Sequence, residues 1–459
     1  MVEARDVAVV GGGFAGLSAA VALSARGFRV AVLEGKPALG GRAYSFADPE
    51  SGDFVDNGQH VLMGCYAETL KFIERIGARD RLVFQNDLAI RMLERDGRSG
   101  MLRTARLPGP LHMTAALIRY PLLAARERAS ALTAGLRLLR LYRRERARLA
   151  DMTVDALMDE LGQGERARRC LWYPIAIATL NENPEAASAA LLAEVLRRAF
   201  FGRRADSAFV YARVGLSDLY CLPSARLIEA GGGVVETRAL ADAFELGPDG
   251  RVAGVRLRDG RRLCAAHYIA AVPPAQLLRL LPDNVRADLF FARAGGISSS
   301  PIICVHAWFD REITDAPFIG FVGTATQWLF NKRRIFAQRG ERANGYLSFV
   351  ISGARDLVDL GNEELLELVT ADLRAMVPAA RDARLLKALV LKEKQATMAP
   401  SPECDRLRPA TATPLANLFL AGDWIQTGLP ATIESAVASG HAAAAAVAAR
   451  AGAVAAMAA

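Results

Sequence analysis

Residues 7–34 read VAVVGGGFAGLSAAVALSARGFRVAVLE, and this stretch decides the fold of the chain. It opens with a short β-branched apolar run, which is typical of a buried parallel strand. A glycine-rich turn follows, and then an apolar segment of good helix formers that stops at Gly27, a residue type typical of helix C-caps. A second apolar run, residues 29–33, ends at Glu34. The stretch therefore predicts a strand, a helix and a second strand parallel to the first.

The turn in this unit has the spacing of a phosphate-binding motif. Gly11, Gly13 and Gly16 follow the pattern GxGxxG. In that pattern the first glycine permits a tight turn, the second lets the backbone approach a pyrophosphate, and the third lets helix and strand pack closely. The helix N-terminus then faces the phosphates, and Glu34 is placed to bind the hydroxyls of an adenosine ribose. We expect a dinucleotide site here, and the alternative is a glycine-rich turn without a ligand.

Two later segments suit the rest of a dinucleotide. Residues 40–42, Gly-Gly-Arg, allow close approach of the backbone to a second phosphate edge and offer a guanidinium for its charge. A predicted strand ends at Gly422-Asp423, whose carboxylate can accept hydrogen bonds from sugar-like hydroxyls. A helix follows from about Thr432, and its free amides suit a ring carbonyl. The alternatives are an ordinary loop and an aspartate that only caps the chain.

The composition is that of a globular protein with an uneven charge distribution. The 459 residues are 52% apolar and 23% charged, with a net charge of +8, which excludes a disordered chain. Between Arg91 and Arg148 there are 14 arginines and four carboxylates. A basic, apolar-rich stretch indicates an anionic surface as partner. Because it holds few aromatic residues for base stacking, we expect a membrane surface and no nucleic acid.

One predicted helix carries much of this charge. Residues 121–150 place Leu132, Leu136 and Leu139 on an apolar face and several arginines on another. Such a helix can rest on anionic lipid headgroups, and the alternative is a solvated helix packed on the rest of the protein. The six cysteines contain no CxxC pair, so we expect reduced thiols and no metal site. With no signal-peptide pattern and no long apolar run, we expect a cytoplasmic protein, peripherally bound to the cytoplasmic face of a membrane.

The motifs together resemble those of one flavoprotein superfamily. The segments GGGFAGLSAA, LEGKPALGGR, VVET, AAVPP, LFLAGDW and TIESAVASG occur in order along the whole chain. They resemble the FAD-dependent amine oxidases and phytoene desaturases. Residues 56–66, DNGQHVLMGCY, narrow the likeness, because they resemble the squalene-associated FAD-dependent desaturases of bacterial hopanoid pathways, understood as hydroxysqualene dehydroxylases.

The resemblance implies a set of residues that hold FAD. Val235 is implied to meet the adenine through its backbone, and Asp423 and the region of Ile433 to hold the ribityl chain and the isoalloxazine ring. No cysteine adjoins the Gly-Asp motif, since the nearest is Cys404, so we expect FAD to be bound non-covalently. The residues implied to bind it are Gly11, Gly13, Phe14, Ala15, Gly16, Glu34, Gly40, Gly41, Arg42, Gly58, Gln59, His60, Val235, Gly422, Asp423, Thr432 and Ile433.

The fold class expected is α/β, or α+β overall, with two interleaved domains as in amine oxidases. One is a Rossmann-type FAD-binding domain, and the other is a substrate domain of mixed sheet and helices. The FAD-binding domain is predicted to comprise residues 1–86, 210–290 and 405–459. The substrate domain is predicted to comprise residues 87–209, with a basic membrane-facing region at 108–150, and residues 291–404.

The resemblance implies reduction of hydroxysqualene to squalene with loss of water. The hydroxyl of this hydrophobic isoprenoid is protonated and leaves, and a hydride comes from reduced FAD. His60 and Asp56 are the titratable groups of the narrowing segment, and a histidine can donate the proton near neutral pH. The alternative is a histidine that only makes structural hydrogen bonds or touches FAD. No second GxGxxG unit is present, so we expect a separate, unidentified electron donor.

Two other functions stay open at this point. One is a carotenoid-type desaturase or an amine oxidase, in which electrons flow from substrate to flavin. The other is a non-enzymatic isoprenoid carrier on the same fold, like the prenyl-binding Rab GDP-dissociation inhibitors, although a carrier does not need the flavin motifs. Six aromatic residues can line an isoprenoid tunnel and stabilise a cation, or can simply pack in the core: Trp172, Tyr173, Phe200, Phe201, Trp328 and Phe330.

Overall fold

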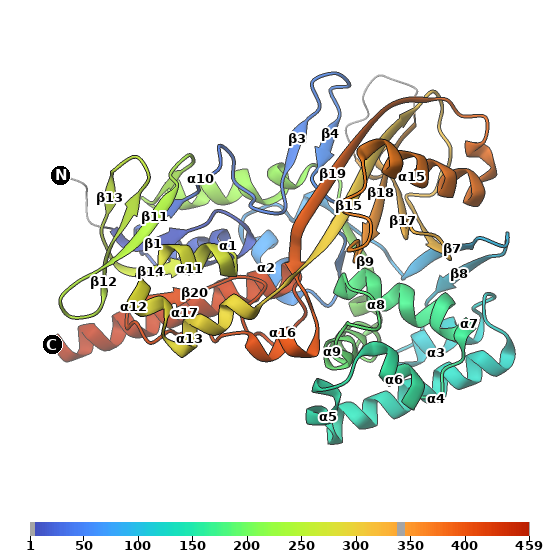
Figure 1. Ribbon diagram of the computed structural model, residues 1–459, viewed down its shortest axis with the longest axis horizontal. Helices are drawn as coiled ribbons and strands as arrows, with labels where there is room; N and C mark the ends of the chain where they lie inside the picture. The colour runs from blue at the N-terminus through green and yellow to red at the C-terminus, as the bar shows by residue number, and fades with distance from the viewer. Residues whose placement is uncertain (1–4, 337–344, 459) are drawn as a thin grey trace.

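The chain folds into two lobes that its sequence crosses several times (Figure 1). The structure, a computed structural model, describes residues 5–336 and 345–458, without the side chains of residues 454–458. The predicted segments 1–86, 291–404 and 405–459 therefore each include a few residues outside the described ranges. In Figure 1 both ends of the chain lie in the left-hand lobe.

The first lobe is built on a five-stranded parallel sheet in the order β10-β2-β1-β14-β20. Val7 of β1 pairs with Val30 on one side and with His267 on the other. The four residues of β2 are fully buried apolar side chains, as parallel strands covered on both faces require. The strands are β1 (Arg5–Val10), β2 (Val30–Leu33), β10 (Val234–Glu236), β14 (Ala265–Ala270) and β20 (Leu418–Leu420).

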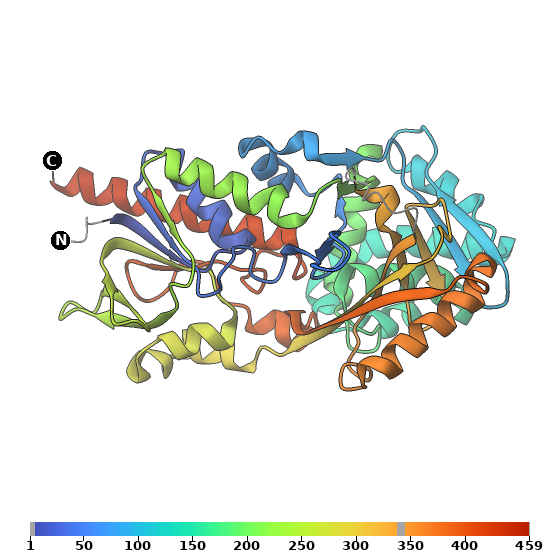
Figure 2. The same cartoon turned by 90° about the horizontal axis from the view of Figure 1, so that it is seen from above.

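Helices cover one face of this sheet, and a small antiparallel sheet lies on the other side. The helix α1 packs along α17, the long helix at the carboxyl end (Figure 2). The apolar cores on the two faces are separate clusters. The elements are α1 (Phe14–Ser24), α10 (Leu222–Ala230), α17 (Ile433–Ala458), β11 (Ala241–Leu246), β12 (Val252–Leu257) and β13 (Arg262–Leu263).

The second lobe is built on a seven-stranded mixed sheet in the order β19-β15-β18-β17-β16-β7-β8. The hairpin β7–β8 forms where Asp96-Gly97 predicts a turn, and it joins the sheet through a parallel pairing with β16. The long strands β15 and β19 reach toward the first lobe (Figure 1). The strands are β7 (Ala89–Glu94), β8 (Ser99–Arg103), β15 (Ser299–Phe309), β16 (Phe318–Val322), β17 (Trp328–Asn331), β18 (Gly345–Ser352) and β19 (Leu385–Met398).

Helix α15 (Asn362–Met376) covers one face of the second sheet, and a layer of helices covers the other. The six predicted tunnel aromatics all lie in or against the apolar cluster beneath this helical layer. Trp328 stacks on Phe330 with ring centroids 6.1 Å apart. The helices of the layer are α3 (Leu111–Ile118), α4 (Ala125–Arg144), α5 (Arg146–Ala150), α6 (Val154–Glu160), α7 (Glu165–Ala167), α8 (Tyr173–Leu180) and α9 (Ala189–Phe200).

The buried face of α4 does not consist of the three leucines of its predicted apolar face. The structure buries Ala131, Ala134 and Leu138, whereas Leu136 is 67% exposed. These three residues have the three- and four-residue spacing of one helix face, and small alanines there let α4 approach α9 and α7 closely. The exposed position of Leu136 is compatible with either reading of this helix, on lipid or in solvent, and the membrane role stays a prediction.

The strands of each sheet come from the segments assigned to that domain by sequence. The parallel sheet takes its strands from within 1–86, 210–290 and 405–459, and the mixed sheet from within 87–209 and 291–404. The boundaries themselves stay predictions. No helix in the described part of the chain is both long enough and apolar enough to cross a bilayer.

Candidate functional site

The glycine turn between β1 and α1 requires glycine at two positions and leaves space at a third. Gly11 has φ +110°, and a Cβ there would lie 2.3 Å from the carbonyl oxygen of Ala271. A Cβ on Gly16 would lie 1.9 Å from the carbonyl oxygen of Gly11. Around Gly13, in contrast, the nearest atom to a built Cβ is 3.8 Å away. The backbone is thus tight where strand and helix meet and open where a pyrophosphate approaches.

The first turn of α1 contains the predicted residues Phe14 and Ala15, both buried. The ring of Phe14 stacks on Tyr220, with centroids 3.6 Å apart. Tyr220 in turn donates its hydroxyl toward the carbonyl oxygens of Gly40, at 2.9 Å, and Ala43, at 2.8 Å. This contact fixes the loop that carries the second glycine pair beside the start of α1.

Glu34 lies at the carboxyl end of β2, next to the strand that carries Val235. Its carboxylate accepts hydrogen bonds from the backbone amides of Gly12 and Lys36, both at 2.8 Å. Val235 is in register with Val32 on the neighbouring strand. An ionised carboxylate has about four acceptor sites, so Glu34 retains capacity for ribose hydroxyls. The structure therefore groups these two predicted adenosine contacts at one edge of the sheet.

Arg42 joins the second glycine pair to the carboxyl-terminal motif. A Cβ on Gly41 would lie 3.3 Å from the Cα of Gly13, so these two turns meet. The Arg42 guanidinium donates to Asp423 Oδ1 at 2.6 Å and to the carbonyl oxygen of Ala396 at 3.1 Å. Burial alone would lower the pKa of Arg42, but the Asp423 carboxylate raises it above its ordinary value. Two residues predicted to hold opposite parts of FAD thus lie within one ion pair.

The loop after β20 is held by an arginine that the sequence analysis did not single out. Arg408, whose side chain is fully buried, donates to the carbonyl oxygens of Asp423, Ile425 and Leu429 at 3.1, 2.6 and 2.6 Å. These contacts hold the loop between Gly422 and α17 in place. The amide of Gly422 itself donates to Ser439 at 2.8 Å. Nothing in the local sequence distinguishes Arg408 from the many other arginines of the chain.

Helix α17 begins at Ile433, directly after Thr432, as predicted. The Thr432 hydroxyl accepts from the Ser435 amide at 3.3 Å, which is N-cap geometry. Glu434 turns away and accepts from the amide and the hydroxyl of Thr69 at 2.9 and 2.7 Å. A small cavity of about 30 Å³ lies beside this helix start, between Tyr66 and α9. The free amides of the first turn remain for a ligand carbonyl.

The segment DNGQH is tied to the glycine turns through Asn57. The backbone amide of Tyr44 donates to Asn57 Oδ1 at 3.0 Å, and Asn57 Nδ2 donates to the carbonyl oxygen of Arg42 at 2.8 Å. Residues 56–60, which we call the DNGQH loop, therefore lie directly beside the predicted phosphate cradle. The FAD contacts implied for Gly58, Gln59 and His60 of this loop stay predictions.

Asp56, predicted as a catalytic residue, is held at three of its atoms. Its Oδ1 accepts from the Leu216 amide at 3.2 Å, and its Oδ2 accepts from Lys332 Nζ at 2.8 Å. Its carbonyl oxygen accepts from His306 Nε2 at 3.0 Å. The side chain is buried, so both carboxylate oxygens are committed inside the protein. This geometry favours a role in positioning the loop, and the catalytic role of Asp56 stays a prediction.

His60, the other predicted catalytic residue, is half-buried. Its Nδ1 lies 2.8 Å from the carbonyl oxygen of Gly58. Because a carbonyl oxygen only accepts, Nδ1 carries the hydrogen, and the neutral ring presents Nε2 as an acceptor. Burial lowers the pKa of His60, against the opposing effect of Asp56. The ring can donate from Nε2 only when it is protonated.

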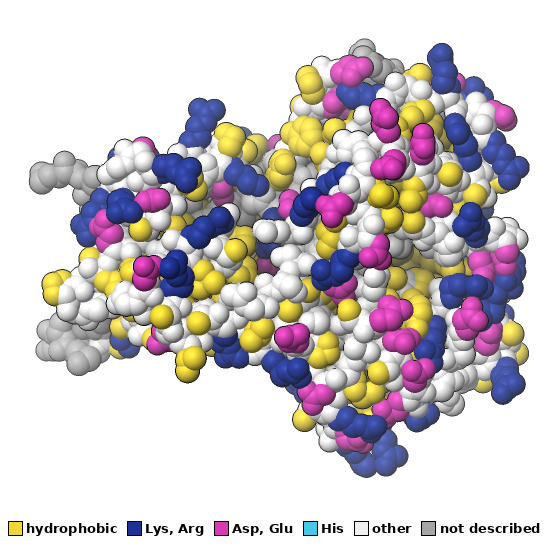
Figure 3. Space-filling view, in the orientation of Figure 1, with side chains coloured by type: hydrophobic (Ala, Val, Ile, Leu, Met, Phe, Trp, Pro, Cys, Tyr) yellow, Lys and Arg dark blue, Asp and Glu magenta, His cyan; other side chains and the backbone are white. Residues whose placement is uncertain are grey.

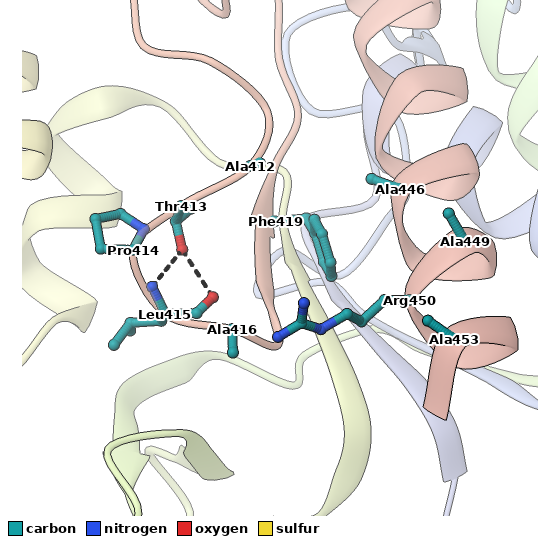
Figure 4. Close-up of a pocket in the computed structure, with 10 residues that line it drawn as sticks. All are labelled: Ala412, Thr413, Pro414, Leu415, Ala416, Phe419, Ala446, Ala449, Arg450 and Ala453. Atoms are coloured by element: carbon teal, nitrogen blue, oxygen red, sulfur yellow. Dashed lines mark hydrogen bonds between the residues drawn. The ribbon is translucent and has the colours of Figure 1, made fainter. Parts of the chain in front are cut away.

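A larger groove lies away from all of these residues. It has a volume of about 500 Å³ and is formed by the loop 412–416 and the carboxyl-terminal half of α17 (Figure 4). Arg450 and Phe419 point into it from α17 and β20. None of the predicted site residues lines this groove.

The described geometry fits FAD. The glycine turns leave a cradle for a pyrophosphate, Glu34 and Val235 flank the adenosine end, and Asp423 and the start of α17 lie where the ribityl chain and ring are expected. Helices α1 and α17 pack together, and helix N-termini favour anionic phosphates and ring carbonyls.

Comparisons with known proteins agree with this fit. A family model described as flavin containing amine oxidoreductase matches residues 14–448. A hydroxysqualene dehydroxylase of Sinorhizobium fredii is 29% identical over 454 residues, covering 96% of this chain and 97% of that protein. A 15-cis-phytoene desaturase of Synechococcus elongatus is 26% identical over 468 residues, covering 97% and 96%. A solved putrescine oxidase variant aligns with a TM-score of 0.74 at 18% identity, over 97% of this chain and 99% of that one.

The chain therefore belongs to the flavin-containing amine oxidoreductase family. It is an FAD-dependent oxidoreductase of the amine oxidase and desaturase superfamily, with the amine-oxidase-like fold. The fold class and the cofactor predicted from the sequence are confirmed. The individual FAD contacts stay predictions that the geometry accommodates.

Proposed function

We propose that this protein reduces hydroxysqualene to squalene with loss of water, in squalene and hopanoid biosynthesis. The observation that carries the proposal is the DNGQH loop, which brings polar side chains beside the flavin cradle through the hydrogen bonds of Asn57. Removal of a hydroxyl needs a polar group near the reacting carbon, whereas desaturation of a pure hydrocarbon does not. The two dehydroxylase relatives, at 29% and 28% identity over nearly the whole chain, support the same conclusion.

The protein's own contribution is binding, orientation and exclusion of water. Reduced FAD supplies the hydride when bound. Aromatic and apolar side chains pack together under the helical layer, and in this proposal the C30 hydrocarbon chain lies against them. Asn57 anchors the DNGQH loop beside the flavin cradle. Gln59 and His60 follow it by two and three residues and are the next polar side chains of the loop. In this mechanism they meet the hydroxyl end while the apolar cluster holds the chain, and FAD itself is bound non-covalently.

The reductant and the location of the enzyme follow from the same proposal. A separate electron donor, a reductase or a membrane quinol, reduces the flavin. The substrate is nearly insoluble in water, so the enzyme works peripherally on the cytoplasmic face of a membrane. We propose that α3, which lies within the predicted membrane-facing region 108–150, and the chain just before it make this contact.

A patch of exposed apolar and basic side chains supports this membrane contact. Its apolar members are 43–53% exposed, and two of them, Leu111 and Ile118, are seven residues apart on α3 and so share one face. Arg103 and Arg106 both lie near the same carboxylate, Asp87, at 4.0 and 3.9 Å, which leaves the patch positive. Helix α3 packs on β8 and α4. We call this surface the α3 patch; its apolar residues are Leu107, Leu111 and Ile118.

The arginines of α4 and α5 lie among acidic side chains. Figure 3 shows basic side chains at the lower edge of the molecule over α5, with acidic side chains among them on the same face. Arg148 of α5, for example, is paired with Glu145 and Glu160 at 3.0 and 2.9 Å. The charge of Arg148 is therefore balanced within the protein.

The direction of electron flow tests the proposed reaction. The purified holoenzyme is reduced anaerobically with dithionite, freed of excess reductant and mixed with hydroxysqualene. We expect the visible absorbance of oxidised flavin to return as squalene forms, in equal amounts. If hydroxysqualene leaves the flavin reduced while a carotenoid precursor reduces the oxidised enzyme, the protein is a desaturase and the proposal is wrong.

A further inference from the structure

Lys332 is a fully buried cation beside the DNGQH loop. Its side chain has no exposed surface. Its Nζ lies 2.8 Å from Asp56 Oδ2, 2.7 Å from Gln59 Oε1 and 4.0 Å from the centroid of the Phe336 ring. An ammonium has three N–H groups, and these three partners account for all of them. The cation is therefore fixed in place, although it lies about 270 residues away from the loop in sequence.

This cation determines how the amide of Gln59 is turned. An ammonium only donates, so the Gln59 atom that faces it must be the carbonyl oxygen. The NH₂ group of the same amide is then directed away from Lys332. Among the described residues no hydrogen bond from Gln59 Nε2 is present, and the residue is only half-buried. Gln59 thus presents two donor hydrogens, in a fixed orientation, next to the flavin cradle.

The rest of the loop gives this arrangement a rigid base. Asp56, the second partner of Lys332, is also bound at its carbonyl by His306 and at Oδ1 by the Leu216 amide. Burial and the nearby Lys332 lower the pKa of His306 to about 3, so His306 is neutral and does not repel the cation. Tyr346 hydrogen-bonds the other ring nitrogen of His306 at 2.9 Å. The amide of Gln59 cannot rotate without breaking a contact of a buried charge, which is costly.

We propose that Gln59 Nε2 donates the hydrogen bond that recognises the hydroxyl oxygen of the isoprenoid substrate, and that Lys332 is the positioning residue that keeps this donor turned toward it. The proposal rests on the proposed function for its substrate class. It assigns Gln59 to the substrate, where the sequence resemblance assigns it to FAD. Binding of the hydroxyl and removal of the hydroxyl are separate events, so they can be measured separately.

The test compares two ligands that differ in the hydroxyl group, on oxidised enzyme that cannot reduce either. Affinities for hydroxysqualene and squalene are measured on the FAD-loaded full chain in detergent, through the change in the flavin spectrum. The variant Gln59→Glu keeps the oxygen that accepts from Lys332 and loses the donor. Lys332→Met keeps the donor and loses the cation that orients it. Lys387→Met is the matched control, since Lys387 pairs with Asp48 at 2.7 Å and lies over Trp308 but does not touch the loop.

We expect the wild-type protein to prefer hydroxysqualene over squalene by about 2- to 10-fold, the range for one neutral hydrogen bond. Gln59→Glu and Lys332→Met abolish that preference and leave squalene affinity unchanged, whereas Lys387→Met keeps it. Where Lys332→Met does not yield folded protein, Gln59→Glu decides the matter by itself, because it retains the buried ion pair.

The proposal is overturned if Gln59→Glu retains the wild-type preference, or if all three variants weaken both ligands equally. A wild-type enzyme that prefers hydroxysqualene in this way but does not reoxidise its flavin with it would refute the proposed reaction and leave the role of Gln59 standing. The two failures are therefore distinguishable.

Discussion

His60 can give up a proton only where its imidazole is protonated, and its surroundings disfavour that form. Burial lowers the pKa of His60 below 6.5, and Nδ1 is committed to Gly58. If His60 delivers the proton to the leaving hydroxyl, the rate of flavin reoxidation by hydroxysqualene rises as the pH falls from 8 toward 5, because the imidazolium fraction increases. The measurement is a stopped-flow rate profile of the pre-reduced enzyme.

The variant His60→Gln keeps a side-chain nitrogen that can donate but cannot titrate. We expect its rate to be about 10²-fold lower than that of the wild type, which is the lower end of the range for general acid catalysis. We also expect this rate to be independent of pH over the same interval. A profile in the variant that parallels the wild-type curve would show that another group titrates, and His60 would then be a structural residue.

For single residues, the sequence predicts a role only where the residues that act together are close to one another in the chain. The glycine turn could be predicted because the GxGxxG spacing of Gly11, Gly13 and Gly16 lies within six residues, between an apolar run typical of a strand and a segment of good helix formers. The buried position of Lys332 could not, because its polar partners are far away in sequence and its neighbours Arg333 and Arg334 give it the appearance of an exposed basic run. Burial of a charge depends on which distant carboxylate meets it.

Two helices of the second lobe are joined by a buried carboxylate. Glu194 of α9 accepts from Tyr142 of α4 and from Arg197 and Arg198 of its own helix. Burial opposes ionisation, but these donors outweigh it and lower the pKa of Glu194 from 4.5 to about 2. A lowered carboxyl pKa stabilises the fold above the unfolded value, so this stability is present above about pH 4.5 and is lost as the pH falls toward 2.

Glu194→Gln should therefore cost on the order of 3 kcal/mol near pH 7 and progressively less below pH 4.5, measured by urea unfolding at several pH values. Glu165→Gln is the control. Glu165 is 91% exposed, and its ion pair with Arg169 is long, at 4.0 Å; such exposed pairs contribute little to stability. An E194Q penalty that is the same at pH 3 and pH 7 would contradict the assigned role of the ionised carboxylate.

Elements were predicted better than their faces. The hairpin at Asp96-Gly97 and the helix over most of 121–150 follow from turn chemistry and periodicity. The buried face of α4 does not, because Ala131 and Ala134 pack as well as leucine where another helix comes close. Leu136, on the predicted apolar face, is exposed, whereas Leu138 is buried.

The whole molecule separates a flavin lobe from a lobe with an exposed apolar and basic surface, the α3 patch. If this patch meets lipid, the double variant Leu111→Glu/Ile118→Glu should weaken binding to vesicles that contain phosphatidylglycerol by at least about tenfold, because each buried leucine or isoleucine contributes about 1.5–3 kcal/mol. Wild-type binding should also fall as salt is raised, since the arginines of the patch act through screened charge. Vesicle co-sedimentation measures both effects.

Leu386 provides the matched control for this prediction. It is 50% exposed, close to the 53% of Ile118, but it lies at the start of β19, at the opposite edge of the second lobe from α3 in Figure 1. Leu386→Glu should leave vesicle binding unchanged. Equal loss in both variants would mean that binding follows overall charge, and unchanged binding in the α3 variant would remove this patch as the membrane surface while leaving the flavin chemistry untouched.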